Sequence, residues 1–257
     1  MSPNAAFISG ITLPYRVRFD ECTPAGVART SSLLRYAQDV AWVHSERLGF
    51  GRDWYAERGL AWVVRSAELR VEQAVPLGES IAVSTAVTGF RKVWARRRTE
   101  ARAADGSLVC WAHTDWVMIG PAGTPCRVPA EFPAAFGVLP GGFEPVRVDL
   151  GPVPEDGAAF DFAVRPQDLD PMGHVNNAAY LDYLEEAVLA ADPAAVAALA
   201  SLPRTLRIEY VLPAAPGARL ASVAWRSDTD WRYRLTDADG RELLRATVDP
   251  GQVLPSA

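Results

Sequence analysis

Runs of β-branched, aromatic and alternating apolar residues predict eight strands along the chain. They occupy residues 61–73, 79–90, 92–103 and 107–119 in the first half, and residues 204–212, 218–227, 230–238 and 241–249 in the second half. Short turns such as "PLG" and "DG" separate them, as is typical of antiparallel strands joined in sequence. The pattern therefore predicts two groups of antiparallel strands.

A segment with a helical pattern precedes the second group of strands. In "AAYLDYLEEAVLA", residues 178–190, apolar side chains occupy most of the helix circumference, and the charges are Asp182, Glu185 and Glu186. A helix that is apolar nearly all round is buried on most sides. Each half of the chain is predicted to contain a strand, a turn, one long helix and then three or four strands. This is an α+β fold in which an antiparallel sheet curls around one long helix, twice.

The two halves are related by an internal repeat. Copy one, residues 15–41, lies over copy two, residues 162–188, without a gap. The identical pairs are Val17 and Val164, Arg18 and Arg165, Pro24 and Pro171, Gly26 and Gly173, Leu34 and Leu181, and Tyr36 and Tyr183. Two further matches follow in the same order, "LRVEQAVPLGESI" with "LRIEYVLPAAPGARL" and "ADGSLV" with "ADGRELL". Three collinear matches indicate a duplication.

Proline and glycine are concentrated between the copies, in residues 121–157. Such a composition is not expected to sustain a helix or a central strand, so it predicts a linker that lies over the surface. The predicted organisation is an N-terminal domain over residues 1–130, a linker over 131–154 and a C-terminal domain over 155–257.

Composition limits the classes of function. The net charge of −5 argues against a nucleic-acid partner, and the three cysteines show neither CxxC spacing nor an even number. No segment has the length and polarity of a signal peptide or a membrane span. These features predict a cytoplasmic protein that needs no metal or other cofactor and has no membrane or nucleic-acid partner.

The stretch "DLDPMGHVNN", residues 168–177, concentrates polar chemistry just before the predicted helix. The overlay places Thr23 at the position of Asp170 and Val27 at that of His174, and it places Arg29 and Thr30 at the two asparagines. Polar residues that served folding alone would be needed in both copies, so the difference favours catalysis. The alternatives are a structural cap and turn, or a metal site through Asp168, Asp170 and His174 that lacks further ligands.

These residues resemble the acyl-acyl carrier protein (ACP) thioesterases of bacteria and plants. That family has a D-L-D-x-N-x-H-V-N-N segment in the second of two hotdog domains, and "GLAWVVRSAELRVEQAVPLGE" and "ADGSLVCWAHTDWVMI" are similar to its first half. The resemblance implies two tandem hotdog subdomains and hydrolysis of fatty acyl thioesters of ACP or coenzyme A. It places the catalytic aspartate at Asp170 and the histidine at His174.

Two departures from the plant enzymes separate this chain from their full catalytic network. Met172 stands where they have an asparagine, and residues 211–215, "VLPAA", replace a Glu-Cys pair. The D-P-M-G-H-V-N-N form is closer to single-hotdog acyl-CoA thioesterases, which use an aspartate at the helix entrance. A non-catalytic acyl-binding protein and a hotdog dehydratase are the alternative functions.

Thioester hydrolysis needs an attacking group and a site for the oxyanion. Asp170 is expected to act as general base or nucleophile, with His174 orienting water or protonating the thiolate. Asn176 or Asn177 is expected to cap the helix, whose first N–H groups would hold the oxyanion, and Gly173 would allow close approach of the substrate. We therefore predict that Asp170, His174 and Asn176 are catalytic and that Gly173 and Asn177 bind the substrate. Asp168 either caps the turn or faces solvent.

Copy one is expected to supply the acyl pocket. Trp42, Trp54, Trp62 and Trp94 either line an apolar tunnel or pack in an ordinary core. Arg96 and Arg98 lie on one face of the strand predicted over residues 92–103, either as a solvated surface or as a site for the phosphates of coenzyme A or for an acidic carrier protein. Further assembly, such as a homodimer, is left open.

Overall fold

The computed structural model describes residues 10–138, 142–155, 157–228 and 230–251. The chain divides into two compact units. Unit 1 comprises Met1–Leu69 and Gln73–Pro145, and unit 2 comprises Arg70–Glu72 and Val146–Ala257. Each unit is a sheet with helices.

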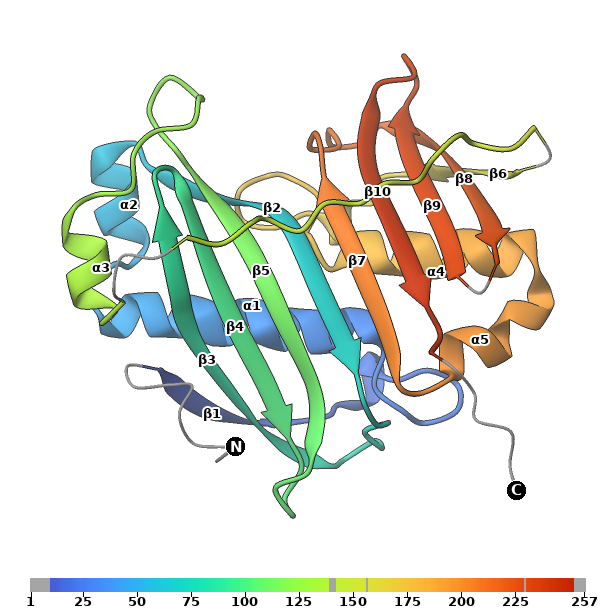
Figure 1. The fold of residues 1–257 in the computed structure, drawn as a ribbon, viewed down its shortest axis with the longest axis horizontal. Coiled ribbons are helices and arrows are strands. Elements are labelled where there is room, and N and C mark those ends of the chain that lie inside the picture. Colours follow the sequence, from blue (N-terminus) through green and yellow to red (C-terminus); the bar gives the residue numbers. More distant parts are fainter. Residues whose placement is uncertain (1–9, 139–141, 156, 229, 252–257) are drawn as a thin grey trace. The chain divides into compact units, whose positions relative to one another are not determined.

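Unit 1 contains five strands and the longest helix of the described residues. The elements are β1 (Ile11–Arg16), the 3-10 helix η1 (Phe19–Glu21), α1 (Thr30–Arg47), α2 (Arg52–Arg58), β2 (Ala61–Val71), β3 (Ser80–Arg91), β4 (Trp94–Arg102), β5 (Leu108–Ile119) and α3 (Glu131–Ala135). The strands lie in the order β1-β3-β4-β5-β2, and α1 lies across one face of β3, β4 and β5 (Figure 1).

Unit 2 is built in the same way. Its elements are β6 (Ala158–Ala163), η2 (Pro166–Asp168), α4 (Ala179–Ala191), η3 (Pro193–Ala195), α5 (Val196–Ala200), β7 (Arg204–Tyr210), β8 (Arg219–Ser227), β9 (Asp230–Asp237) and β10 (Glu242–Asp249). The strands lie in the order β6-β8-β9-β10-β7, and α4 contacts β6, β8 and β9.

The strand order of unit 2 repeats that of unit 1, element for element. The neighbouring strands β1, β3, β4 and β5 pair antiparallel, as do β6, β8, β9, β10 and β7. All eight predicted strands are present, and each end lies within two residues of the predicted one. The sequence repeat therefore corresponds to a repeated topology.

Both long helices bury apolar side chains against their own sheets. In α4, Leu181, Leu184 and Val188 are fully buried, as the apolar circumference predicted. In α1, Leu34 and Val40 are equally inaccessible. Burying one apolar side chain of this size stabilises the fold by about 1.5–3 kcal/mol. The two helices are therefore held firmly on their sheets, and so are the turns that lead into them.

The proline- and glycine-rich segment does not lie wholly on the surface as predicted. It forms α3, and Phe132 and Phe136 are buried in an aromatic core where the Phe132 ring stacks 4.3 Å from that of Phe50. Proline is tolerated in the first turn of a helix, and aromatic burial offsets the poor helix propensity. Residues 139–141 of the predicted linker lie outside the described residues, and 142–155 contain no helix or strand.

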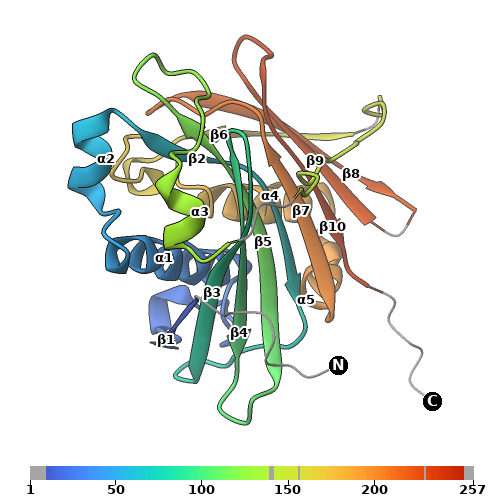
Figure 2. The ribbon, with the colours of Figure 1, turned by 60° about the vertical axis from the view of Figure 1, so that its left-hand side comes forward.

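Two of the four tryptophans considered for an apolar tunnel lie in the same aromatic core. Trp54 and Trp62 pack around Phe132, together with Tyr55 of α2. Figures 1 and 2 both show α2 and α3 near the end of α1 that leads into α2. Trp42, in contrast, is 43% exposed on α1. Core packing therefore accounts for Trp54 and Trp62.

None of the helices in the described ranges combines the length and the apolar character that a membrane crossing requires.

Candidate active site

The turn before α4 has the same backbone hydrogen bonds as its counterpart before α1. The N–H of Asp170 donates to the His174 carbonyl at 2.8 Å, and that of Gly173 donates to the Asp170 carbonyl at 2.9 Å. The bonds from Thr23 to Val27 and from Gly26 to Thr23 have the same lengths. The duplicated backbone makes copy one a structural control for copy two.

The Asp170 side chain is what distinguishes the two turns. Its Oδ1 accepts hydrogen bonds from the N–H groups of Met172 at 2.8 Å and His174 at 3.3 Å. No other hydrogen bond to this half-buried carboxylate occurs within the described residues. In copy one, the buried hydroxyl of Thr23 has no partner among the described residues. One carboxylate oxygen is thus fixed by the turn, and Oδ2 is available to a ligand.

His174 is exposed, and the structure does not bring its side chain to Asp170. Its backbone N–H and carbonyl both bond to Asp170, but no hydrogen bond of the imidazole ring occurs within the described residues. The two residues share a turn without forming a catalytic pair in this structure.

The helix begins later than the asparagines, so the predicted helix cap is only partly right. Ala178 is the N-cap residue and has no side-chain capping bond, and α4 starts at Ala179. Asn176 caps a preceding turn: its Oδ1 accepts from the Ala178 N–H at 2.9 Å, and its carbonyl accepts from the Ala179 N–H at 2.9 Å. The turn places the helix entrance at residues 176–179.

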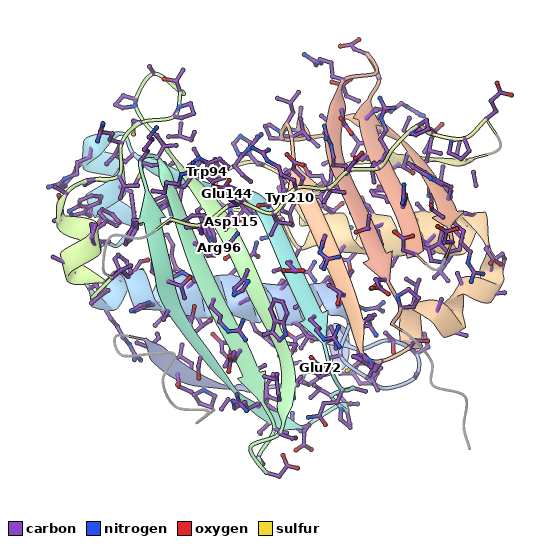
Figure 3. All side chains as sticks on the ribbon, viewed as in Figure 1. Glu72, Trp94, Arg96, Asp115, Glu144 and Tyr210 are labelled. Atoms are coloured by element: carbon purple, nitrogen blue, oxygen red, sulfur yellow. The ribbon has the colours of Figure 1, made fainter. Side chains whose placement is uncertain are left out.

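Two tyrosines that no sequence pattern singles out contact this entrance. The Tyr210 hydroxyl, on β7 (labelled in Figure 3), donates to the Asn177 carbonyl at 3.0 Å. The Tyr180 hydroxyl accepts from the Ala214 N–H at 3.0 Å, and the two rings lie 5.7 Å apart. Burial raises the pKa of Tyr180, and the nearby negative charge of Asp170 adds to this effect. No local sequence pattern links residue 210 to residue 177.

Asp168 is a buried structural residue that caps the 3-10 turn, so the solvent-facing alternative is wrong. Its Oδ2 accepts from the Tyr183 hydroxyl at 2.7 Å and from Nε of Arg165 at 3.0 Å. The matching set in copy one is Glu21, which bonds to Tyr36 and Arg18. In the repeat, the arginine and the tyrosine of this set are identical, and both copies have an acid. This shared set was the sequence signal that Asp168 has a structural role.

The pKa of Asp168 predicts a pH dependence of stability. Burial alone would raise this pKa, but hydrogen bonds from Arg165 and Tyr183 hold it below the usual value. A carboxyl whose pKa is lower in the folded state stabilises the fold at pH values above the unfolded pKa of about 3.9. This contribution is lost as the pH falls through the folded pKa. We expect the urea midpoint to fall more steeply below about pH 4 in the wild type than in Asp168→Asn. Equal pH dependence in both proteins would contradict this role.

Gly173 has a backbone conformation that favours glycine. Its φ is +76°, and a Cβ added there would meet no atom within 4 Å. Gly26, its counterpart, has φ of +72° and equally open surroundings. The turn alone therefore accounts for both glycines, because side chains rarely adopt this region.

Arg96 and Arg98, predicted to bind the substrate, already have partners within unit 1. Arg96 forms a bidentate pair with the fully buried Asp115, at 2.7 and 2.8 Å, and also donates to the Glu144 carbonyl at 2.8 Å (Figure 3). Arg98 pairs with Glu100 at 2.8 Å and contacts His113 at 3.1 Å. An incoming phosphate would compete with these carboxylates.

In the part of the chain that the structure describes, no three histidine, cysteine, aspartate or glutamate side chains form a group that could hold a metal ion.

Two protein-family models match this chain and identify its class. Residues 164–250, which include the Asp170 turn, match the model of the thioesterase-like superfamily. Residues 11–136 match the model of the acyl-ACP thioesterase N-terminal domain. The chain belongs to the acyl-ACP thioesterase family, as its motifs implied, and is an enzyme that hydrolyses fatty acyl thioesters. No curated protein sequence gives a significant match.

Solved structures show the same fold over nearly the whole chain. A protein from Lactobacillus plantarum assigned as an oleoyl thioesterase has a TM-score of 0.83 at 20% identity, over 93% of this chain and 95% of its own. An acyl-ACP thioesterase from Bacteroides thetaiotaomicron gives 0.78 at 16%, over 94% and 97%. The 12:0-ACP thioesterase from Umbellularia californica gives 0.75 at 20%, over 93% and 96%. The hotdog type of fold is thereby confirmed.

Proposed function

We propose that Asp170 is the reactive carboxylate of this thioesterase. The main support is the comparison of the two turns: their backbone hydrogen bonds coincide, yet only copy two has a carboxylate at this position, where copy one has Thr23. A group needed for folding would be expected in both. The Asp168 and Glu21 sites follow that expectation, and the Asp170 and Thr23 sites do not.

The anchored geometry of Asp170 suits either role that the chemistry allows. With Oδ1 fixed by two N–H groups, Oδ2 can accept a proton from a water that attacks the thioester carbonyl, or it can attack the carbonyl itself. The first route gives the acid and the thiol directly. In the second, attack displaces the thiolate and forms a mixed anhydride, which water then hydrolyses to the free acid and the Asp170 carboxylate.

The helix entrance is proposed to stabilise the oxyanion. Within the described residues, no oxygen accepts a hydrogen bond from the Asn177 N–H. This N–H lies two residues before α4 begins, near the positive end of the helix dipole, so it can stabilise a developing negative charge. Tyr210 holds the Asn177 carbonyl and so fixes this part of the backbone, while Asn176 holds the Ala178 N–H.

The finer organisation is proposed from the repeat. Each unit is proposed to be a hotdog subdomain around one long helix. The bounds expected from the sequence, residues 1–130, a linker over 131–154 and a catalytic subdomain over 155–257, stay a prediction, with α3 of the expected linker packed in the core of unit 1. Acyl-ACP is the proposed substrate and acyl-CoA the second candidate. The roles in substrate binding expected for Gly173, Asn177, Arg96 and Arg98 stay predictions. Cytoplasmic location and a homodimer remain predictions.

A panel of acyl thioesters tests this function. Purified protein is mixed with acyl-ACP and acyl-CoA of several chain lengths, and released thiol is read with a thiol reagent. We expect release well above buffer, with higher kcat/KM for the ACP series. Measurable binding without release for every chain length would instead favour an acyl-binding protein.

His174→Ala is expected to slow hydrolysis less than loss of Asp170. The imidazole is exposed and makes no hydrogen bond within the described residues, so it can assist only a bound water or the leaving thiolate, which needs little help because thiols are acidic. We expect a decrease in kcat of roughly tenfold, below the usual range for a general base. A loss equal to that of Asp170→Asn would show that the two residues act as a pair.

A further inference from the structure

Arg97 is a buried cation on the inner face of the unit 1 sheet. Side chains alternate between the faces of a strand, so Arg97 on β4 points away from the face of Arg96 and Arg98. It is only 6% exposed, and its partners lie on α1 and β3: Nη1 is 2.9 Å from Nδ1 of His44 and 3.4 Å from the Thr85 hydroxyl. The group is thus enclosed between the sheet and α1.

No carboxylate balances this charge within the described residues. Arg96, Arg98 and Arg102, on the opposite face of β4, each pair with an acid, whereas Arg97 has no ion pair and uses only Nη1 for hydrogen bonds. The edge formed by Nε and Nη2, which binds carboxylates in a bidentate manner, makes no hydrogen bond there.

A buried charge without a counter-ion is costly, and it persists in proteins mainly where it is paired or functional. Burial lowers the pKa of Arg97 to about 10, which still leaves the guanidinium charged at neutral pH. Neither His44 nor Thr85 supplies a formal negative charge. Within the described residues, the Nε and Nη2 atoms of Arg97 therefore have no anionic partner and could bind one from a ligand.

An aromatic core lies beside the guanidinium of Arg97. Arg97 lies 5.8 Å from the centre of the Phe136 ring, and Phe136 belongs to the aromatic core with Phe50, Phe132 and Phe90. A hydrated inorganic anion would gain little from these rings. An apolar chain that ends in a carboxylate could pack against the rings and pair with the cation.

We propose that Arg97 binds the carboxylate of an acid with an apolar chain. Two sources share this chemistry: the free fatty acid that hydrolysis produces, and an acyl thioester with a second carboxylate at the far end of its chain. Binding of the free acid is independent of the proposed role of Asp170, and the thioester source rests on the proposed function.

Calorimetric titration with decanoate tests the proposal, with decanol as the neutral ligand of equal chain length. The wild type is expected to bind decanoate at least tenfold more tightly than decanol, and Arg97→Met is expected to remove this preference. Arg97→Lys keeps the charge and should retain part of it. Arg102→Met, on the same strand but the opposite face, should bind as the wild type does. Equal affinity for the two ligands in the wild type, or an unchanged preference in Arg97→Met, would overturn the proposal.

Two further arms separate the sources. If the thioester is the ligand, Arg97→Met lowers kcat/KM at least tenfold for an ω-carboxyacyl thioester but not for the unsubstituted thioester of equal length. If the product is the ligand, both thioesters react alike and Arg97→Met relieves inhibition by decanoate. Decanoate binding by Asp170→Asn, whose turnover is expected to be far slower than that of the wild type, keeps failure of this proposal distinct from failure of the catalytic one. If Arg97→Met does not fold, the affinities of the wild type and of Arg97→Lys for decanoate and decanol still test the proposal.

Discussion

Asp170→Asn is expected to release thiol from acyl-ACP roughly 100 to 10,000 times more slowly than the wild type, the range usual for loss of a general base. The amide cannot accept the proton of the attacking water and is a poor nucleophile. Because the loss concerns the reacting group, it should fall on kcat and leave KM nearly unchanged. Initial rates at saturating substrate measure it.

Asparagine is the matched replacement because it preserves the turn. Its Oδ1 can accept the same two N–H groups, from Met172 and His174, that the carboxylate accepts. The melting temperature should therefore remain within a few degrees of the wild type. Turnover similar to the wild type in this folded variant would remove Asp170 from the mechanism.

Asp168→Ala has the largest effect expected on stability, a loss of roughly 3 kcal/mol in the free energy of unfolding. The substitution leaves the buried Tyr183 hydroxyl without its acceptor and removes the partner of Arg165. The estimate is at the low end for a buried pair because Arg165 is half exposed and can turn toward water. Urea unfolding at pH 7 measures the change.

Glu21→Ala is the control that the duplication provides. It removes the equivalent acid from Arg18 and Tyr36 and should destabilise the protein by a similar amount. Both variants should retain kcat per folded molecule at a temperature where they are folded. Loss of turnover in Asp168→Ala without loss of stability would mean that Asp168 takes part in the reaction.

Much of the fold could be predicted because its signals are local. The strands follow from β-branched runs and turns, and the burial of α4 follows from its apolar circumference. The short helix α3 was missed because proline and glycine dominate its neighbourhood, whereas its stability comes from Phe132 and Phe136 in a distant aromatic core. The start of α4 was missed because a separate turn at Asn176 precedes it.

The candidate site could be predicted in part. The repeat singled out Asp170, since Thr23 occupies the same backbone position. Composition could not separate the buried Asp168 from the half-buried Asp170, because their difference depends on contacts with Arg165 and Tyr183. The contact of Tyr210 with Asn177 joins residues far apart in sequence, and no pattern within one strand or one turn encodes it.

Thiol release by Asp170→Thr and Thr23→Asp, compared side by side, tests the central claim most directly. Each variant gives one turn the residue of the other, and each residue already occurs on the same backbone. The account predicts that Asp170→Thr folds but loses hydrolysis, while Thr23→Asp keeps the rate of the wild type. Wild-type turnover by a folded Asp170→Thr would contradict it.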